Sequence, residues 1–255
     1  MPKDRPVRDA RLAVSLLTLV PTGATWPDGE QTQVAAWFPA VGAIFGLVGY
    51  GVVKAFAALH AQSRAAYVVA ALVVVAWALM SRLLHWDGLA DVADGFWGAD
   101  ERTRRLEIMS DSRTGAFGAT AVGLVVVLEV AAIGAIVARP HELPILLVPV
   151  LSRFSATAGA WLGKPARPGG LGRAVTGRPT WLSVVIGIVP LVAALTGVWL
   201  GFNATGLALG FFGVLVAFAV PHVLSERFGG VTGDVMGASV LLTETVLFAA
   251  FALAV

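Results

Sequence analysis

The sequence predicts an all-α protein, a polytopic bundle of about seven transmembrane helices with a short N-terminal interfacial or partial helix. Two observations support this fold class. The 255 residues are 57% hydrophobic and only 13% charged, with a mean hydropathy of +0.81, whereas soluble domains are about one-quarter charged. Several segments also approach the roughly 20 apolar residues that cross about 30 Å of hydrocarbon. We therefore expect a single integral membrane domain over residues 1–255.

Seven segments are long and apolar enough to be expected as membrane spans. In chain order they are residues 33–59, 64–84, 116–138, 143–163, 181–200, 204–223 and 238–255. Residues 10–21 form a shorter apolar run, which we expect to enter the membrane partially or to lie at its interface. The 29 glycines fit close helix packing in lipid. Because the chain has no cysteine, it has no disulfide framework and no thiolate metal site.

Basic residues gather on one side of the bundle if each predicted span crosses once. That side holds fourteen of them, against three on the other. The fourteen are Lys3, Arg5, Arg8, Arg11, Arg82, Arg102, Arg104, Arg105, Arg113, Lys164, Arg167, Arg173, Arg178 and Arg227; the three are Lys54, Arg64 and Arg139. The positive-inside rule places the richer side in the cytoplasm. The net charge of +2 gives no reason to expect a nucleic-acid partner.

The stretch "HWDGLADVADG", residues 85–95, is the strongest candidate site. Asp87, Asp91 and Asp94 stand at i, i+4 and i+7, so on a helix they fall within about 60° of arc. Like charges on one face repel, and a bound cation would turn that penalty into a gain. Carboxylates without thiols favour Mg²⁺, or Mn²⁺, over zinc, and Mg²⁺ usually shares its shell with substrate phosphates. The alternatives are a solvated juxtamembrane helix and a site of proton or ion translocation.

A second acidic pair follows in "RRLEIMSDSRTGAFG". Glu107 and Asp111 are again four residues apart, and they would complete a one-metal or two-metal clamp if they faced the first helix. The basic residues of this stretch can meet phosphate oxygens. They are Arg104, Arg105 and Arg113. The alternative is an amphipathic interfacial helix whose charges pair with one another.

A glycine-rich stretch, "RFGGVTGDVMGA" at residues 227–238, is expected on the same side of the membrane. Its glycines permit unusual dihedral angles and close backbone approach, Thr232 is a hydrogen-bond donor, and Asp234 adds a carboxylate. The candidate substrate-binding residues here are Gly229, Gly230, Thr232 and Gly233, and Asp234 is a candidate metal ligand. The alternative is a plain turn.

Arg153 stands alone inside a predicted span, where a charge costs about 2.5–3.5 kcal/mol. We expect it to face the interior of the bundle and to meet an anion. It either binds a substrate phosphate or neutralises a buried acid, and Glu129 and Glu244 are the candidate partners.

These motifs, together with the upstream "LLTLVPTG" and "WFPAVGAIFGLVGYG", closely resemble the cobalamin synthase family, the adenosylcobinamide-GDP ribazoletransferases. The resemblance covers nearly the whole chain in the family's order, so the chain is identified as a member. It implies a multi-pass, Mg²⁺-dependent enzyme of the bacterial or archaeal plasma membrane, acting late in vitamin B12 biosynthesis. In the implied reaction α-ribazole, or its 5′-phosphate, attacks adenosylcobinamide-GDP. The products are GMP and adenosylcobalamin, or its 5′-phosphate.

The resemblance suggests a division of roles as a hypothesis. Magnesium would be held by Asp87, Asp91, Asp94 and Asp111, with Glu107 and Asp234 as further ligands. The leaving phosphate would be stabilised by Arg104, Arg105 and Arg113. Asp111 would accept the proton of the attacking hydroxyl. The catalytic set is then Asp91, Asp111 and Arg113.

Three other functions remain as alternatives. "DVADG" and "EIMSD" partly match the Asp-rich motif of CDP-alcohol phosphotransferases, with Glu107 in place of an aspartate and a shorter spacing. Isoprenyl transferases with two Asp-rich motifs also hold a Mg²⁺ diphosphate beneath a membrane bundle. A secondary transporter is the third, although transporters place ionisable residues near the bilayer midplane, whereas these acids lie at a membrane edge.

Overall fold

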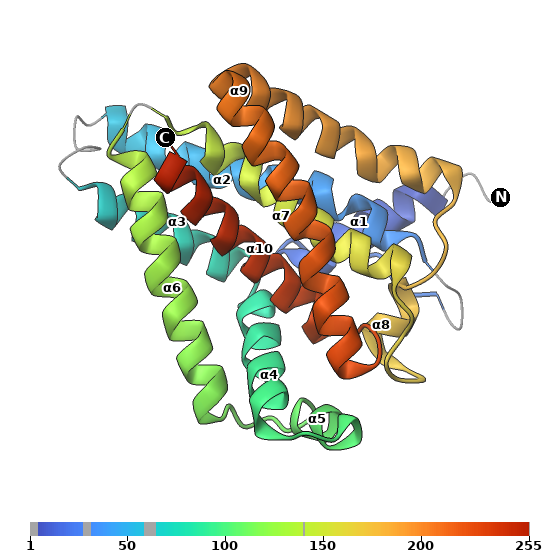
Figure 1. The fold of residues 1–255 in the computed structure, drawn as a ribbon. Coiled ribbons are helices and arrows are strands. Elements are labelled where there is room, and N and C mark those ends of the chain that lie inside the picture. The colour runs from blue at the N-terminus through green and yellow to red at the C-terminus, as the bar shows by residue number, and fades with distance from the viewer. Residues whose placement is uncertain (1–4, 28–31, 59–64, 140, 255) are drawn as a thin grey trace.

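The computed structural model describes residues 5–27, 32–58, 65–139 and 141–254. The regular structure in these residues is helical, apart from one isolated bridge between Pro165 and Val231. Figure 1 shows an elongated bundle of long helices with short helices at one end. The helices are α1 (Arg5–Leu17), the 3-10 helix η1 (Val34–Trp37), α2 (Phe38–Ala58), α3 (Ala66–Met80), α4 (Leu84–Gly98), α5 (Arg102–Ile108), α6 (Ala116–Val137), α7 (Leu143–Leu162), α8 (Gly170–Val175), α9 (Trp181–Phe228) and α10 (Gly233–Ala254). The predicted all-α membrane fold is confirmed.

Five helices in the described residues are long and apolar enough to cross a membrane, and α3 with α4 makes a sixth if this bent pair is one broken span. The five are η1 with α2, then α6, α7, α9 and α10. Helix α9 has 48 residues and non-helical backbone at Asn203 (φ 52°, ψ −127°). Its two arms meet there in a sharp angle (Figure 1). The arms contain the two spans predicted at 181–200 and 204–223, which accounts for the seventh expected segment.

Several predicted boundaries are displaced. The span predicted to reach residue 84 ends at Met80, because Arg82 (φ 53°) and Leu83 (φ 61°) leave the helical region and the chain turns by 88° into α4. Helix α10 begins at Gly233, five residues before the predicted span, so half of the glycine-rich stretch lies in this helix. Residues 59, 64 and 255, at the ends of predicted spans, lie outside the described residues, as do Lys3 and Arg64.

Helix α1 is the short N-terminal helix that the sequence predicts. It begins at Arg5 and has thirteen residues, or about 20 Å, which is too short to cross the hydrocarbon. Asp9 of this helix is buried, and its carboxylate accepts a hydrogen bond from the backbone N–H of Gln33 at 3.0 Å. This contact ties α1 to the start of η1.

Helices α7 and α10 form the interior of the bundle, and most of their length is buried inside it. Helix α7 packs against α2, α9 and α10, and α10 also packs against α4 and α6. The short helices α4, α5 and α8 lie together at one end, near the start of α10 (Figure 1). The acidic and glycine-rich motifs therefore meet at one end of the bundle.

Candidate functional site

The site is built where α4 crosses the first turn of α10. A Cβ atom added to Gly88 would lie 2.9 Å from the carbonyl oxygen of Asp234 and 3.0 Å from its Cα. Since both are backbone atoms, this approach needs a residue without a side chain. Gly88 stands between Asp87 and Asp91 on α4, so the crossing brings the carboxylate of Asp234 to theirs.

The electrostatic surroundings of Asp91 show how closely these acids are gathered. Its carboxylate is half-buried and is repelled, in decreasing order, by Asp234, Asp87 and Asp94. Arg167 is the cation that attracts Asp91, and it attracts Asp234 as well. Arg167 was not among the predicted site residues, because it stands in a Pro- and Gly-rich loop without helical periodicity. The site thus combines a carboxylate cluster with a guanidinium group.

A cavity of about 290 Å³ opens beside this cluster, and we call it the inner cavity. Asp87, Arg167 and Asp234 line its more exposed part, and His85 and Arg153 line its buried part. Its walls also include residues 169–172 at the start of α8 and residues 231–233 at the start of α10, so Thr232 and Gly233 line this cavity.

The glycine-rich stretch divides into a turn and a helix start. Gly229 (φ 69°) and Gly230 (φ 150°) adopt the positive φ expected of glycine, and both line a different cavity of about 620 Å³ between α7 and α9. Thr232 caps α10, because its Oγ1 accepts the Val235 N–H at 3.1 Å. The Thr232 hydroxyl also donates to Asp234 Oδ2 at 3.2 Å. This residue therefore positions Asp234 at the mouth of the inner cavity.

Asp94 lies on α4 with Asp87 and Asp91, but its carboxylate is used differently. It is buried and accepts backbone N–H groups from the start of α6, from Gly115 at 2.6 Å and from Gly118 at 2.8 Å. These N–H groups have no partner inside α6, so Asp94 caps that helix and interacts favourably with its dipole. These two hydrogen bonds of Asp94 thus connect α4 to the start of α6 at the site.

The second acidic pair lies in a separate, shallow cavity of about 280 Å³, which we call the outer cavity. Glu107 pairs with Arg104 at 2.9 Å and Asp111 with Arg113 at 2.7 Å. Hydrogen bonds from Arg113 lower the pKa of Asp111 to about 2, and the same contacts raise the pKa of Arg113.

Of the three aspartates in the first motif, Asp94 lines the outer cavity, together with Glu107 and Asp111. The structure therefore does not bring Glu107 and Asp111 into the inner cavity with Asp87 and Asp234. Among the described residues, no group of three His, Asp or Glu side chains is close enough to hold a metal ion by itself.

Arg105 has a structural part in this arrangement. Its guanidinium group donates to the backbone oxygen of Ala99 at 2.8 Å and to that of Arg227 at 3.0 Å. Arg102 donates to the Phe228 oxygen at 3.1 Å and to the Ala166 oxygen at 3.0 Å. These bonds tie α5 to the end of α9.

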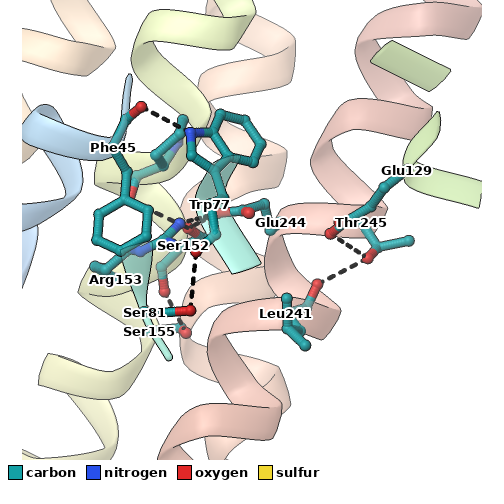
Figure 2. Close-up of polar contacts among 11 residues, drawn as sticks. Phe45, Trp77, Ser81, Glu129, Ser152, Arg153, Ser155, Leu241, Glu244 and Thr245 are labelled. Atoms are coloured by element: carbon teal, nitrogen blue, oxygen red, sulfur yellow. Dashed lines mark hydrogen bonds and ion pairs between the residues drawn. The ribbon is translucent and has the colours of Figure 1, made fainter. Parts of the chain in front are cut away.

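Arg153 lies fully buried in the centre of the bundle and forms an ion pair with Glu244 of α10 (Figure 2). Of the two roles considered for Arg153, the structure shows the neutralisation of a buried acid. Ser152 donates to the same carboxylate at 2.7 Å, and the guanidinium group lies over the ring of Phe45, 4.1 Å from its centroid. Glu129, the other candidate partner, accepts instead from Thr245 at 2.9 Å, away from the ion pair.

His85 is the first residue of the aspartate motif, and its place beside the aspartates makes it a candidate for the site. It is 1% exposed, and neither ring nitrogen has a hydrogen-bond partner in the described part of the chain. Its position in the wall of the inner cavity makes it part of the site.

Comparisons with known proteins identify similar chains. The family model described as "Cobalamin-5-phosphate synthase" matches residues 9–252. An adenosylcobinamide-GDP ribazoletransferase of Syntrophobacter fumaroxidans is 38% identical over 252 residues, covering 94% of this chain and 96% of its own. The enzyme of the same name from Frankia casuarinae is 36% identical, covering 92% and 91%, and that of Pseudomonas putida strain W619 is 36% identical, covering 88% and 89%. No solved structure matches the chain.

Proposed function

The chain belongs to the cobalamin-5-phosphate synthase family, and from this premise we propose that it joins α-ribazole, or its 5′-phosphate, to adenosylcobinamide-GDP. A ribose hydroxyl oxygen forms a bond to the phosphorus that carries the cobinamide. The bond from that phosphorus to the GMP oxygen breaks, and GMP leaves. The products are adenosylcobalamin, or its 5′-phosphate, and GMP, and the hydroxyl proton goes to a protein carboxylate.

The observation that carries this proposal is the gathering of Asp87, Asp91 and Asp234 beside Arg167 at the mouth of the inner cavity. Phosphoryl transfer to a hydroxyl requires cations for the diphosphate and an acceptor for the proton. Arg167 can bind phosphate oxygens through its planar, multi-donor group. The carboxylates would repel a diphosphate unless a metal ion lay between them.

The donor set suits Mg²⁺, which binds through one or two carboxylates and completes its octahedron with water and phosphate oxygens. Asp87 and Asp234 would hold it, and the repulsion between these two carboxylates is the penalty that a cation relieves. The described residues contain no three-residue cage, which favours an ion shared with the substrate over one enclosed by protein. Bound there, the ion would neutralise charge that develops on the diphosphate.

The proton of the attacking hydroxyl is best assigned to Asp91. Asp111, the acceptor expected from the sequence, has a pKa of about 2 and is held by Arg113, so it is a weak base. Partial burial and then three neighbouring carboxylates oppose the charge of Asp91, and both favour uptake of a proton by this group. Asp94 and Thr232 position the helices that carry the reacting groups.

The proposed reaction takes place at the cytoplasmic face of the plasma membrane. Arg102, Arg105 and Arg167 lie at the end of the bundle that carries the site. Lys54 and Arg139 lie at the other end of the bundle. Lys54, near the end of α2, pairs with Glu142, and Arg139, which follows α6, donates to the backbone oxygen of Ala252 in α10. The positive-inside rule supports a cytoplasmic site.

The test uses the purified protein in liposomes with adenosylcobinamide-GDP, α-ribazole and Mg²⁺, and mass spectrometry to identify the products. We expect equal amounts of GMP and adenosylcobalamin, and loss of both with a chelator. Absence of the products would refute the proposed reaction, and a yield unaffected by the chelator would refute the role of the metal ion.

A further inference from the structure

The inner cavity differs between its two ends. Asp87 is exposed, and Arg167 and Asp234 are half-buried, so this end opens to water. Its other end is lined by side chains at most 4% exposed, including Phe38, Met236 and Val240. A molecule in this cavity would therefore keep one polar end at the aspartate cluster and bury the other end among apolar side chains.

Arg153 does not offer a free positive charge to the buried end. Its charge is matched by Glu244, and Ser152 also donates to that carboxylate. An anion placed beside this neutral pair would lose its water without gaining a full counter-charge. The buried part of the occupant should therefore be uncharged.

His85 adds a specific requirement at this buried end. Every form of an imidazole has at least one N–H donor, and both His85 nitrogens lack a partner in the described residues. The ring of Phe45 meets the imidazole in an edge-on contact, with centroids 6.3 Å apart, which helps to fix its orientation. Since buried polar groups are nearly always hydrogen-bonded, an unpartnered imidazole in a cavity wall indicates a ligand with a matching acceptor.

The volume of the cavity selects between the two substrates. Its volume of about 290 Å³ lies near the lower limit of about 300 Å³ for small-molecule pockets. A heterocyclic nucleoside fits this space, whereas a corrinoid joined to a guanosine diphosphate is several times larger. The larger substrate must reach the aspartate cluster from outside.

We propose that the inner cavity binds the nucleoside acceptor, with its uncharged heterocycle at the buried end and its ribose beside Asp87 and Asp234, and that His85 donates a hydrogen bond to the unsubstituted ring nitrogen of the heterocycle. This inference rests on the proposed function, because α-ribazole is a benzimidazole nucleoside with one such nitrogen. In this arrangement His85 determines the specificity for the base, and the carboxylates act on the ribose.

The experiment measures binding of α-ribazole to the purified protein in nanodiscs by calorimetry, with no second substrate present. The matched ligand is the dimethylindole nucleoside, in which a C–H group replaces the acceptor nitrogen. We expect wild-type protein to bind α-ribazole about 10- to 100-fold more tightly than this analogue, because the analogue leaves the buried donor unpaired. Equal affinities would overturn the inference, and this comparison needs no variant.

Two substitutions locate the effect. His85→Leu removes the donor and should bind both ligands with the same weak affinity, whereas His85→Gln keeps a donor and should recover part of the preference. Both variants should bind adenosylcobinamide-GDP within about twofold of wild type. A His85→Leu protein that still prefers α-ribazole, or that loses the corrinoid substrate to the same extent, would contradict the assignment.

The turnover assay separates this inference from the proposed function. If the wild-type protein forms adenosylcobalamin but does not distinguish the two nucleosides, the proposed reaction is supported and the proposed role of His85 is refuted. If it forms no product, the proposed function is refuted.

Discussion

Replacement of Gly88 by alanine tests whether the crossing of α4 and α10 organises the site. The new Cβ would lie 3.0 Å from the Asp234 Cα and 2.9 Å from its carbonyl oxygen. Carbon atoms in contact prefer about 3.5–4.0 Å, so the helices must separate by about 0.5–1 Å. A displacement of about 1 Å in a catalytic site costs about 100-fold in rate. We therefore expect Gly88→Ala to lower GMP release by about two orders of magnitude.

The stability of this variant should change much less than its activity. Overpacking costs about 1–3 kcal/mol, and alanine recovers about 0.5–1 kcal/mol over glycine inside a helix. Gly123→Ala is the matched control, because no atom lies within 4 Å of its added Cβ on α6. Thermal unfolding and GMP release would be measured for both variants. Wild-type turnover in Gly88→Ala, or an equal loss in Gly123→Ala, would refute the reasoning.

Three further predictions concern charge and topology. Asp91→Asn should lower GMP release at least 100-fold but leave thermal stability in metal-free buffer unchanged or raised, because it removes repulsion among the carboxylates; wild-type activity would remove Asp91 from the site. Glu244→Gln should lower the free energy of unfolding by about 3–5 kcal/mol, because Arg153 is left buried and unpaired. The double variant Arg153→Met/Glu244→Leu should recover most of that loss, and an unchanged midpoint in the single variant would contradict the ion pair's role. A single cysteine at Thr103 should react with a membrane-impermeant thiol reagent only from the cytoplasmic side, and one at Thr205, near the break in α9, only from outside; the reverse pattern would overturn the proposed orientation.

Much of this architecture could be predicted from the sequence, because lipid imposes strong local constraints. Apolar length defined the spans, and the cost of a charge in hydrocarbon placed Arg153 beside a buried acid, where Glu244 is found. The 88° turn after Met80 could not be predicted, because Arg82 and Leu83 carry its positive φ angles without glycine or proline.

Fewer features of the site could be predicted. Helical spacing shows on which face of its helix a side chain lies, but it does not show which groups of other elements that side chain contacts. Asp94 was expected at the metal, and its position on α4 fits that role equally well, but its carboxylate caps α6, whose start lies more than twenty residues further along the chain. Arg167 comes from a loop whose course depends on contacts with α5 and with Val231, so no local pattern marked it.

The most direct test of the proposed transfer follows oxygen atoms through one turnover. α-Ribazole labelled with ¹⁸O in its ribose hydroxyl groups is converted with unlabelled adenosylcobinamide-GDP, and both products are analysed by mass spectrometry. If a ribose oxygen attacks the phosphorus that carries the cobinamide, all of the label appears in adenosylcobalamin, including the atom that bridges ribose and phosphate, and GMP carries none. A nucleoside joined to GMP, or a bridging oxygen without label, would contradict the account.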